Sequence, residues 1–168
     1  ITLKIKNMIN TIKDNFKRAL YALIFSIITI GTLSFLEFET PYGLFLAGSF
    51  GSSMVLLFGY PESPFAQPKN VFFGHLVTSI VGVLILKFLP VDQFLQIAIA
   101  VGLGIFVMII LGVTHPPAGG NPIVIIVGAY SYDFLLNPII FGSIIIIIYA
   151  IILNRFILKK NYPSSWKS

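Results

Sequence analysis

Two histidines, His75 and His115, stand inside or at the edge of long apolar stretches of the 168-residue sequence. An ionisable side chain is costly to keep at membrane depth, and it is a functional candidate by default. A neutral histidine can donate a hydrogen bond to an anion, and a protonated one can neutralise the anion and carry its proton. For His75 we favour a functional role. For His115, which precedes Pro116 and Pro117, a site role and a structural bond to a backbone carbonyl are equally open.

Two apolar segments, 43–60 and 118–132, are interrupted by glycine, serine or proline. Such interruptions break a helix and free backbone N–H and C=O groups, which lipid cannot satisfy, so both segments should lie inside the bundle. Ser52 and Ser53 are typical of helix N-caps, and the Asn-Pro pair at 121–122 is a stronger signal for a helix start. The sequence therefore predicts two short helices that begin within the membrane.

The starts of these two short helices form a site for an anion if they face each other. A helix start carries about half a positive charge and free N–H groups, which favour an anion. The predicted substrate-binding residues are Gly51, Ser52, Ser53, His75, His115, Gly119, Gly120 and Asn121. The alternative role for glycines is close helix packing, which we favour at four other positions, Gly82, Gly102, Gly104 and Gly112.

A proline-rich connector, residues 61–70, follows the first interrupted segment. Its three prolines make it rigid. Lys69 can keep an entrance positive for an incoming anion, or it can extend its amine to the membrane surface. The predicted vestibule residues are Gln67, Lys69 and Asn70.

The composition places these residues in a membrane protein. Hydrophobic residues make up 57% of the chain and charged residues 10%, whereas soluble domains carry about 25% charged residues. This composition excludes a soluble globular domain and a disordered chain. A membrane-spanning helix needs roughly 20 residues, a length approached or reached by segments 19–36, 71–89, 94–114 and 138–158. We expect a basic N-terminal segment (1–18), a transmembrane domain (19–158) and a basic tail (159–168).

Basic residues gather at both ends of the chain. Nine of the eleven Lys and Arg residues precede residue 19 or follow residue 154. The bias of such residues toward the cytoplasm predicts two cytoplasmic termini in an integral membrane protein, which we expect in a prokaryotic inner membrane. Both clusters would face lipid headgroups, so the expected partner is the lipid bilayer and not nucleic acid. The expected interface anchors are Tyr21, Tyr162 and Trp166.

The two interrupted segments resemble each other. An offset of 69 residues aligns Gly51 with Gly120 and Gly59 with Gly128. We interpret the match as a duplication of a three-segment unit; the alternative is chance alignment of Ile-rich sequence. The predicted fold is all-α, a polytopic membrane helical bundle with about four full spans and two broken segments. Its two three-segment halves would have opposite orientations, the inverted-repeat plan of many transporters.

Motifs for enzyme chemistry are missing from the sequence. It has no cysteine, no phosphate-binding glycine loop with its lysine, and no His-Glu-x-x-His pattern. We therefore expect no enzyme activity, no cofactor and no metal site. The oligomeric state is open, with a homo-oligomer (dimer or trimer) as one alternative.

Four stretches, residues 50–53, 63–70, 74–75 and 114–119, resemble the HPP family of small integral membrane proteins, named for its His-Pro-Pro motif. The resemblance extends over nearly the whole chain and implies a bundle of four spans. Cyanobacterial and plastid members are assigned nitrite transport. The resemblance therefore implies a transporter of a small inorganic anion, with nitrite first and nitrate or another monovalent anion next. Rival interpretations are a channel for a small neutral solute and a structural or assembly subunit without transport.

Overall fold

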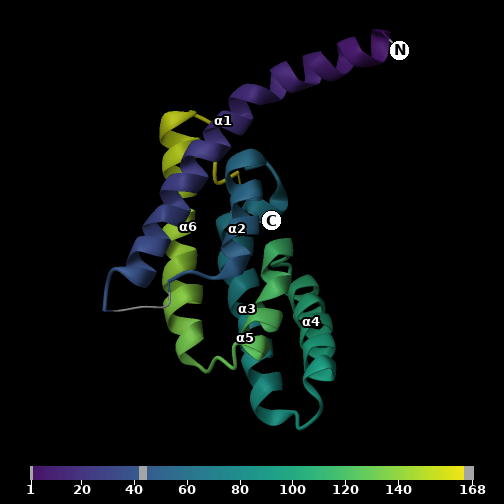
Figure 1. The fold of residues 1–168 in the computed structure, drawn as a ribbon, viewed down its shortest axis with the longest axis vertical. Coiled ribbons are helices and arrows are strands. Elements are labelled where there is room, and N and C mark those ends of the chain that lie inside the picture. Colours follow the sequence, from purple (N-terminus) through teal and green to yellow (C-terminus); the bar gives the residue numbers. More distant parts are fainter. Residues whose placement is uncertain (1, 42–44, 165–168) are drawn as a thin grey trace.

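The computed structural model describes residues 2–41 and 45–164, although not the side chains of residues 2–4, 6, 7, 9 and 14. The described residues form helices and contain no strand (Figure 1). The α-helices are α1 (Thr2–Phe38), α2 (Gly48–Met54), α3 (Pro68–Phe88), α4 (Gln93–Ile110), α5 (Asn121–Val127) and α6 (Ser143–Ile151). The π-helical turns are η1 (Val55–Gly59), η4 (Leu135–Gly142) and η5 (Ile152–Ile157), and the 3₁₀ turns are η2 (Pro64–Ala66) and η3 (Pro116–Gly120).

Four of these helical stretches are long and apolar enough to cross a membrane: Asn10–Phe38, Pro68–Phe88, Gln93–Ile110 and Leu135–Ile157. Each overlaps one predicted span, which confirms the helical membrane bundle. The first helix begins earlier than predicted, because the basic N-terminal segment continues α1 and extends beyond the bundle (Figure 1). Helix α4, the third of these stretches, ends before the predicted residue 114. Gly112 adopts a left-handed backbone conformation (φ 61°), which terminates a helix.

Both predicted breaks are present. Two shorter apolar helices, Gly48–Gly59 (α2 with η1) and Pro116–Val127 (η3 with α5), follow stretches of non-helical chain. The predicted start of the first broken segment, residue 43, lies outside the described residues. From neighbouring starts, α2 rises and α5 descends in Figure 1, so the two short helices run in opposite directions.

The predicted helix caps are wrong. The N-cap of α2 is Ala47, and Ser52 and Ser53 lie inside the helix. The N-cap of α5 is Gly120, and the side chain of Asn121 makes no capping bond. Helix α2 begins about one turn before Ser52 and Ser53, as the hydrogen bond from the Phe50 N–H to the Ala47 carbonyl shows. The polar side chains bond residues on other elements instead, as described below.

An offset of 68 residues relates the two halves of the bundle, one fewer than the 69 predicted from the sequence. It matches the two short apolar helices to each other and Gly74 to Gly142. A Cβ added to Gly74 would lie 2.9 Å from the carbonyl oxygen of Val113, and one added to Gly142 would lie 2.9 Å from that of Phe45. Phe45 and Val113 are themselves 68 positions apart. Each half therefore contacts the other in the same way, as expected around a twofold axis, which supports the predicted inverted repeat.

α3 lies at the centre of the bundle, where it contacts α4, α5 and α6. Two predicted packing glycines serve these contacts. A Cβ on Gly82 of α3 would lie 2.9 Å from a backbone carbon of α5, and one on Gly104 of α4 would lie 3.3 Å from a side chain of α3. The packing role is wrong for Gly102, whose Cβ would meet no described atom within 4 Å, and for Gly112, which ends α4.

Large apolar side chains cover much of the outer surface of the described helices, as lipid contact requires. Phe106 of α4, for example, is 58% exposed. One expected interface anchor is wrong: Tyr162 is buried and donates a hydrogen bond to the Ala66 carbonyl at 2.8 Å. Tyr21 is half-buried, and Trp166 lies outside the described residues.

Candidate functional site

Two histidine side chains and one serine meet in the interior of the bundle. Ser53 Oγ of α2 lies 3.1 Å from His75 Nε2 of α3 and 2.9 Å from Nε2 of His115, the residue before η3. The two imidazole rings are 4.9 Å apart, centroid to centroid, and edge-on to each other. All three side chains are completely buried. Residues 22 and 62 positions away in sequence therefore converge on one hydroxyl.

The partners of the outer ring nitrogens determine where the protons lie. His115 Nδ1 is 2.7 Å from the Phe65 carbonyl, which can only accept, so Nδ1 carries a hydrogen and Nε2 of the neutral ring accepts. His75 Nδ1 is 3.1 Å from the amide nitrogen of Asn121, a donor, so the hydrogen of His75 is on Nε2 and points to Ser53. The neutral network thus runs in one direction, from Asn121 through His75, Ser53 and His115 to Phe65.

Asn121 anchors the other end of this network. Its amide nitrogen donates to the His75 carbonyl at 3.1 Å and lies 2.9 Å from Ser79 Oγ and 3.3 Å from Thr78 Oγ1. Because a carbonyl can only accept, the His75 carbonyl fixes the orientation of the amide. The amide oxygen accepts a hydrogen bond from Ser49 Oγ at the start of α2.

Sequence reasoning missed three members of the network, Ser49, Thr78 and Ser79. Ser49 lies one helical turn before Ser53, and Thr78 and Ser79 lie three and four residues after His75. Residues at these spacings share a helix face, so the same-face rule was the available signal.

The structure brings together four of the eight predicted binding residues: Ser53, His75, His115 and Asn121. Gly51 and Ser52 are exposed, because they lie two residues and one residue before Ser53 and therefore point away from the buried face of α2. Gly119 and Gly120 are half-buried in η3, and a Cβ on either would meet no described atom within 4 Å.

Two of the three predicted vestibule residues, Gln67 and Asn70, bond backbone carbonyls. Gln67 is 1% exposed, and its amide nitrogen donates to the carbonyls of Pro61 and Ser63 at 2.9 and 3.0 Å. Asn70 donates to the Thr114 carbonyl at 2.9 Å, next to His115. Lys69 is half-buried. Gln67 and Asn70 therefore stabilise the connector and the chain before η3, and they do not line an open entrance.

The network has the chemistry of a small polar ligand site, built from neutral donors and two titratable rings. Within the described part of the chain, no cluster of three or more His, Cys, Asp and Glu side chains forms. The side chains fill the site and bond each other, so a ligand must displace some of these bonds.

The chain is similar to known membrane proteins along most of its length. The family model described as "HPP, transmembrane region" matches residues 11–163. Two transmembrane proteins of Dictyostelium discoideum are 34% identical over 128 residues and 35% identical over 130 residues, or 72% and 73% of this chain. The matches cover 45% and 42% of those proteins, so the chain spans less than half the length of these curated relatives. No solved structure matches. With this match over residues 11–163, the chain belongs to the HPP transmembrane family.

Proposed function

We propose that the chain carries a small inorganic anion across the membrane together with a proton. The observation that supports this most strongly is the completely buried network of Ser53, His75 and His115, extended by Asn121, where the two broken segments meet. Polar and ionisable groups inside a membrane are costly and mark ion pathways and proton relays. The family resemblance makes nitrite the first anion to test, followed by nitrate.

The network has a place for one further proton. In the neutral network the Ser53 hydroxyl donates to His115 Nε2. After His115 takes up a proton, Nε2–H donates to Ser53 Oγ, which still accepts from His75 and turns its own hydrogen to the Ser49 carbonyl, 3.1 Å away. A hydroxyl oxygen can accept two bonds while it donates one. The added charge therefore leaves every bond of the network made, and it neutralises an incoming anion.

Neutral donors around this proton replace the water of the anion. The Asn121 amide and the hydroxyls of Ser49, Thr78 and Ser79 lie at one end of the network. Because these groups bond each other in the closed structure, the anion enters when one half of the inverted repeat moves against the other. Such movement around a central site is the alternating-access mechanism of inverted-repeat transporters.

The test is nitrite uptake into vesicles that contain the purified protein and an internal pH dye. We expect saturable uptake above protein-free vesicles, with one proton entering per anion. Ser53→Ala removes the shared hydroxyl and should lower uptake roughly thirtyfold, because it removes two network bonds worth about 1 kcal/mol each. Ser52→Ala is the matched control, since Ser52 is the adjacent serine on the exposed face.

Three outcomes contradict the proposal. Nitrite uptake without proton entry removes the role of the network as a proton carrier. Equal passage of uncharged solutes indicates a neutral-solute channel. The absence of any flux in correctly assembled protein indicates a structural or assembly subunit.

A further inference from the structure

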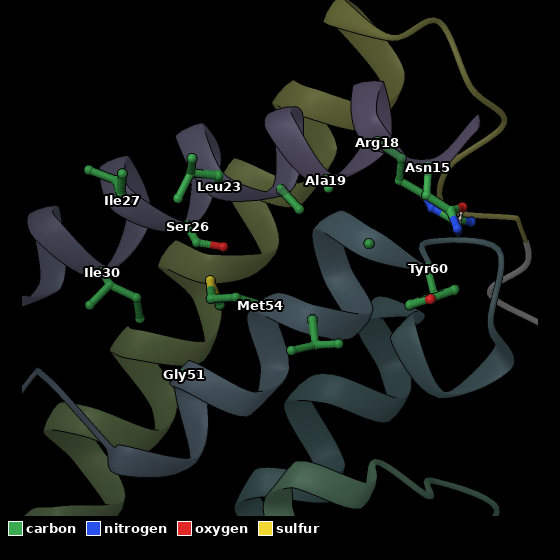
Figure 2. A pocket seen from close by; sticks show the side chains of 13 residues that line it. Asn15, Arg18, Ala19, Leu23, Ser26, Ile27, Ile30, Gly51, Met54 and Tyr60 are labelled. Carbon is green, nitrogen blue, oxygen red and sulfur yellow. Dashed lines mark hydrogen bonds between the residues drawn. The ribbon is translucent and has the colours of Figure 1, made fainter. Parts of the chain in front are cut away.

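A groove of about 730 Å³ lies between α1 on one side and α2 and η1 on the other, away from the histidine network (Figure 2). One wall is a single face of α1, with Ala22, Ser26 and Ile30 at four-residue spacing. The opposite wall includes Met54 and Gly59, and Gly59 has space where a Cβ would be. Its volume is within the range of about 300–1,000 Å³ that is common for ligand sites. The middle of the groove is apolar, apart from the Ser26 hydroxyl.

One end of the groove is polar and basic. The Arg18 guanidinium donates to Asn15 and lies over the ring of Tyr60, with Cζ 4.7 Å from the ring centroid. A second cavity of about 310 Å³ also has Arg18 in its wall, together with Lys17 and Lys160. An apolar groove and a basic pocket therefore adjoin at Arg18, and both basic segments of the chain contribute to the pocket.

The length of the groove matches one leaflet of a bilayer. Arg18 and Ile30 are twelve residues apart on α1, which corresponds to about 18 Å along a helix. The hydrocarbon core of a membrane is about 30 Å thick, so one leaflet is about half of that. An acyl chain that starts at the level of Arg18 would fill the groove to the region of Ile30.

We propose that this groove binds one anionic phospholipid, with its phosphate against Arg18, Lys17 and Lys160 and one acyl chain between α1 and α2. Charge favours a lipid over a second copy of the chain as the occupant. Nine of the eleven basic residues lie near the chain ends, so the basic ends of a second copy would repel the cationic pocket of the first. The proposal does not depend on the anion passage proposed above.

The test is native mass spectrometry of the full chain in detergent with equal amounts of phosphatidylglycerol and phosphatidylcholine that carry the same acyl chains. We expect one retained phosphatidylglycerol per chain. Arg18→Gln should lower the preference for phosphatidylglycerol roughly fivefold, the effect of one cation near an anionic headgroup. Arg155→Gln is the matched control, because it removes a cation of the other basic segment that lines neither cavity. Ser26→Leu fills the groove and should reduce retention of both lipids.

The outcomes separate the occupants. Equal retention of the two lipids by the unaltered chain, or an equal loss in the Arg18 and Arg155 variants, overturns the proposal. A lipid-free dimer that Ser26→Leu dissociates shows that a second copy fills the groove. Displacement of the lipid by free glycerol phosphate shows that only the basic pocket binds, and it removes the acyl chain from the proposal.

Discussion

Gly74→Ala tests whether the tight contact beside the histidines positions them. A Cβ at Gly74 would lie 2.8 Å from the Cβ of His115 and 2.9 Å from the Val113 carbonyl oxygen. Neither neighbour is the end of a flexible side chain, so α3 or residues 113–115 must move. His115 would move with them, and its bonds to Ser53 and Phe65 would lengthen.

The expected cost follows from three terms. Overpacking a core with one methyl group costs about 1–3 kcal/mol. Weakening two buried hydrogen bonds costs up to about 1 kcal/mol each, and replacing glycine by alanine within a helix returns up to about 1 kcal/mol. The net destabilisation is about 2 kcal/mol, which lowers the melting temperature of a chain of this size by roughly 4–8 °C.

The assay is thermal unfolding of the purified protein in detergent, followed by intrinsic fluorescence. Gly102→Ala is the control, because it makes the same replacement inside a transmembrane helix where a Cβ meets no described atom within 4 Å. We expect this control to melt at or above the unaltered protein. If Gly74→Ala melts as high as Gly102→Ala, the contact between α3 and residues 113–115 is not tight and the reasoning fails.

Two further changes test buried polar groups. Thr29 Oγ1 is buried without a hydrogen-bond partner in the described structure. Thr29→Val keeps the shape of the side chain and should raise the melting temperature by a few degrees, equivalent to about 1 kcal/mol. A melting temperature below that of the unaltered protein would show that the hydroxyl has a bound partner. Burial raises the pKa of the Tyr162 hydroxyl above its ordinary value, so the folded protein keeps this proton to a higher pH than the unfolded chain does. The contribution of Tyr162 to stability is therefore complete below pH of about 10 and is lost as the pH rises further. Tyr162→Phe should therefore lower stability by about 1 kcal/mol at neutral pH and flatten the alkaline decline, and an unchanged decline would assign it to other groups.

Hydropathy and helix breakers were sufficient to predict the architecture. A span needs only a long apolar stretch, and a break needs only glycine or proline inside one, so both are local properties of the sequence. The exact start of a short helix is not local in this way. Ser52 and Ser53 were expected to cap α2, but the helix begins at Gly48. Both serines therefore lie inside α2, where Ser53 faces the interior of the bundle and Ser52 is exposed.

The histidine network depends on pairings that no local pattern contains. His75 and His115 were singled out because a titratable residue is unusual in an apolar stretch, but nothing in the sequence shows that both contact the same hydroxyl. Gln67 was expected at an entrance because it is polar and lies in a loop. Its carbonyl partners at Pro61 and Ser63 show that a polar loop residue can instead be buried to hold the loop backbone.

The repeated helices and the single histidine network together set the cost of opening the site in the proposed mechanism. The offset of 68 residues makes Ser53 and Asn121 equivalent, and both contact His75, whereas the equivalent of His75 in the second half is Ser143, whose buried hydroxyl has no partner in the described structure. The chemistry of the network is therefore built around one copy of a repeated position, with groups contributed by both halves.

In the proposed alternating-access mechanism, movement of one half against the other must break the hydrogen bonds that join the two halves. At least five hydrogen bonds of the network do so: Ser49 to Asn121, Ser53 to His115, His115 to Phe65, and Asn121 to Nδ1 and the carbonyl of His75. At about 1 kcal/mol each, they keep the open form roughly 5 kcal/mol above the closed one, a population well below one part in a thousand. An anion that accepts bonds from the freed donors lowers this cost only while it is bound. Under the proposed transport mechanism, the same bonds that close the site to water would therefore make its opening depend on the anion.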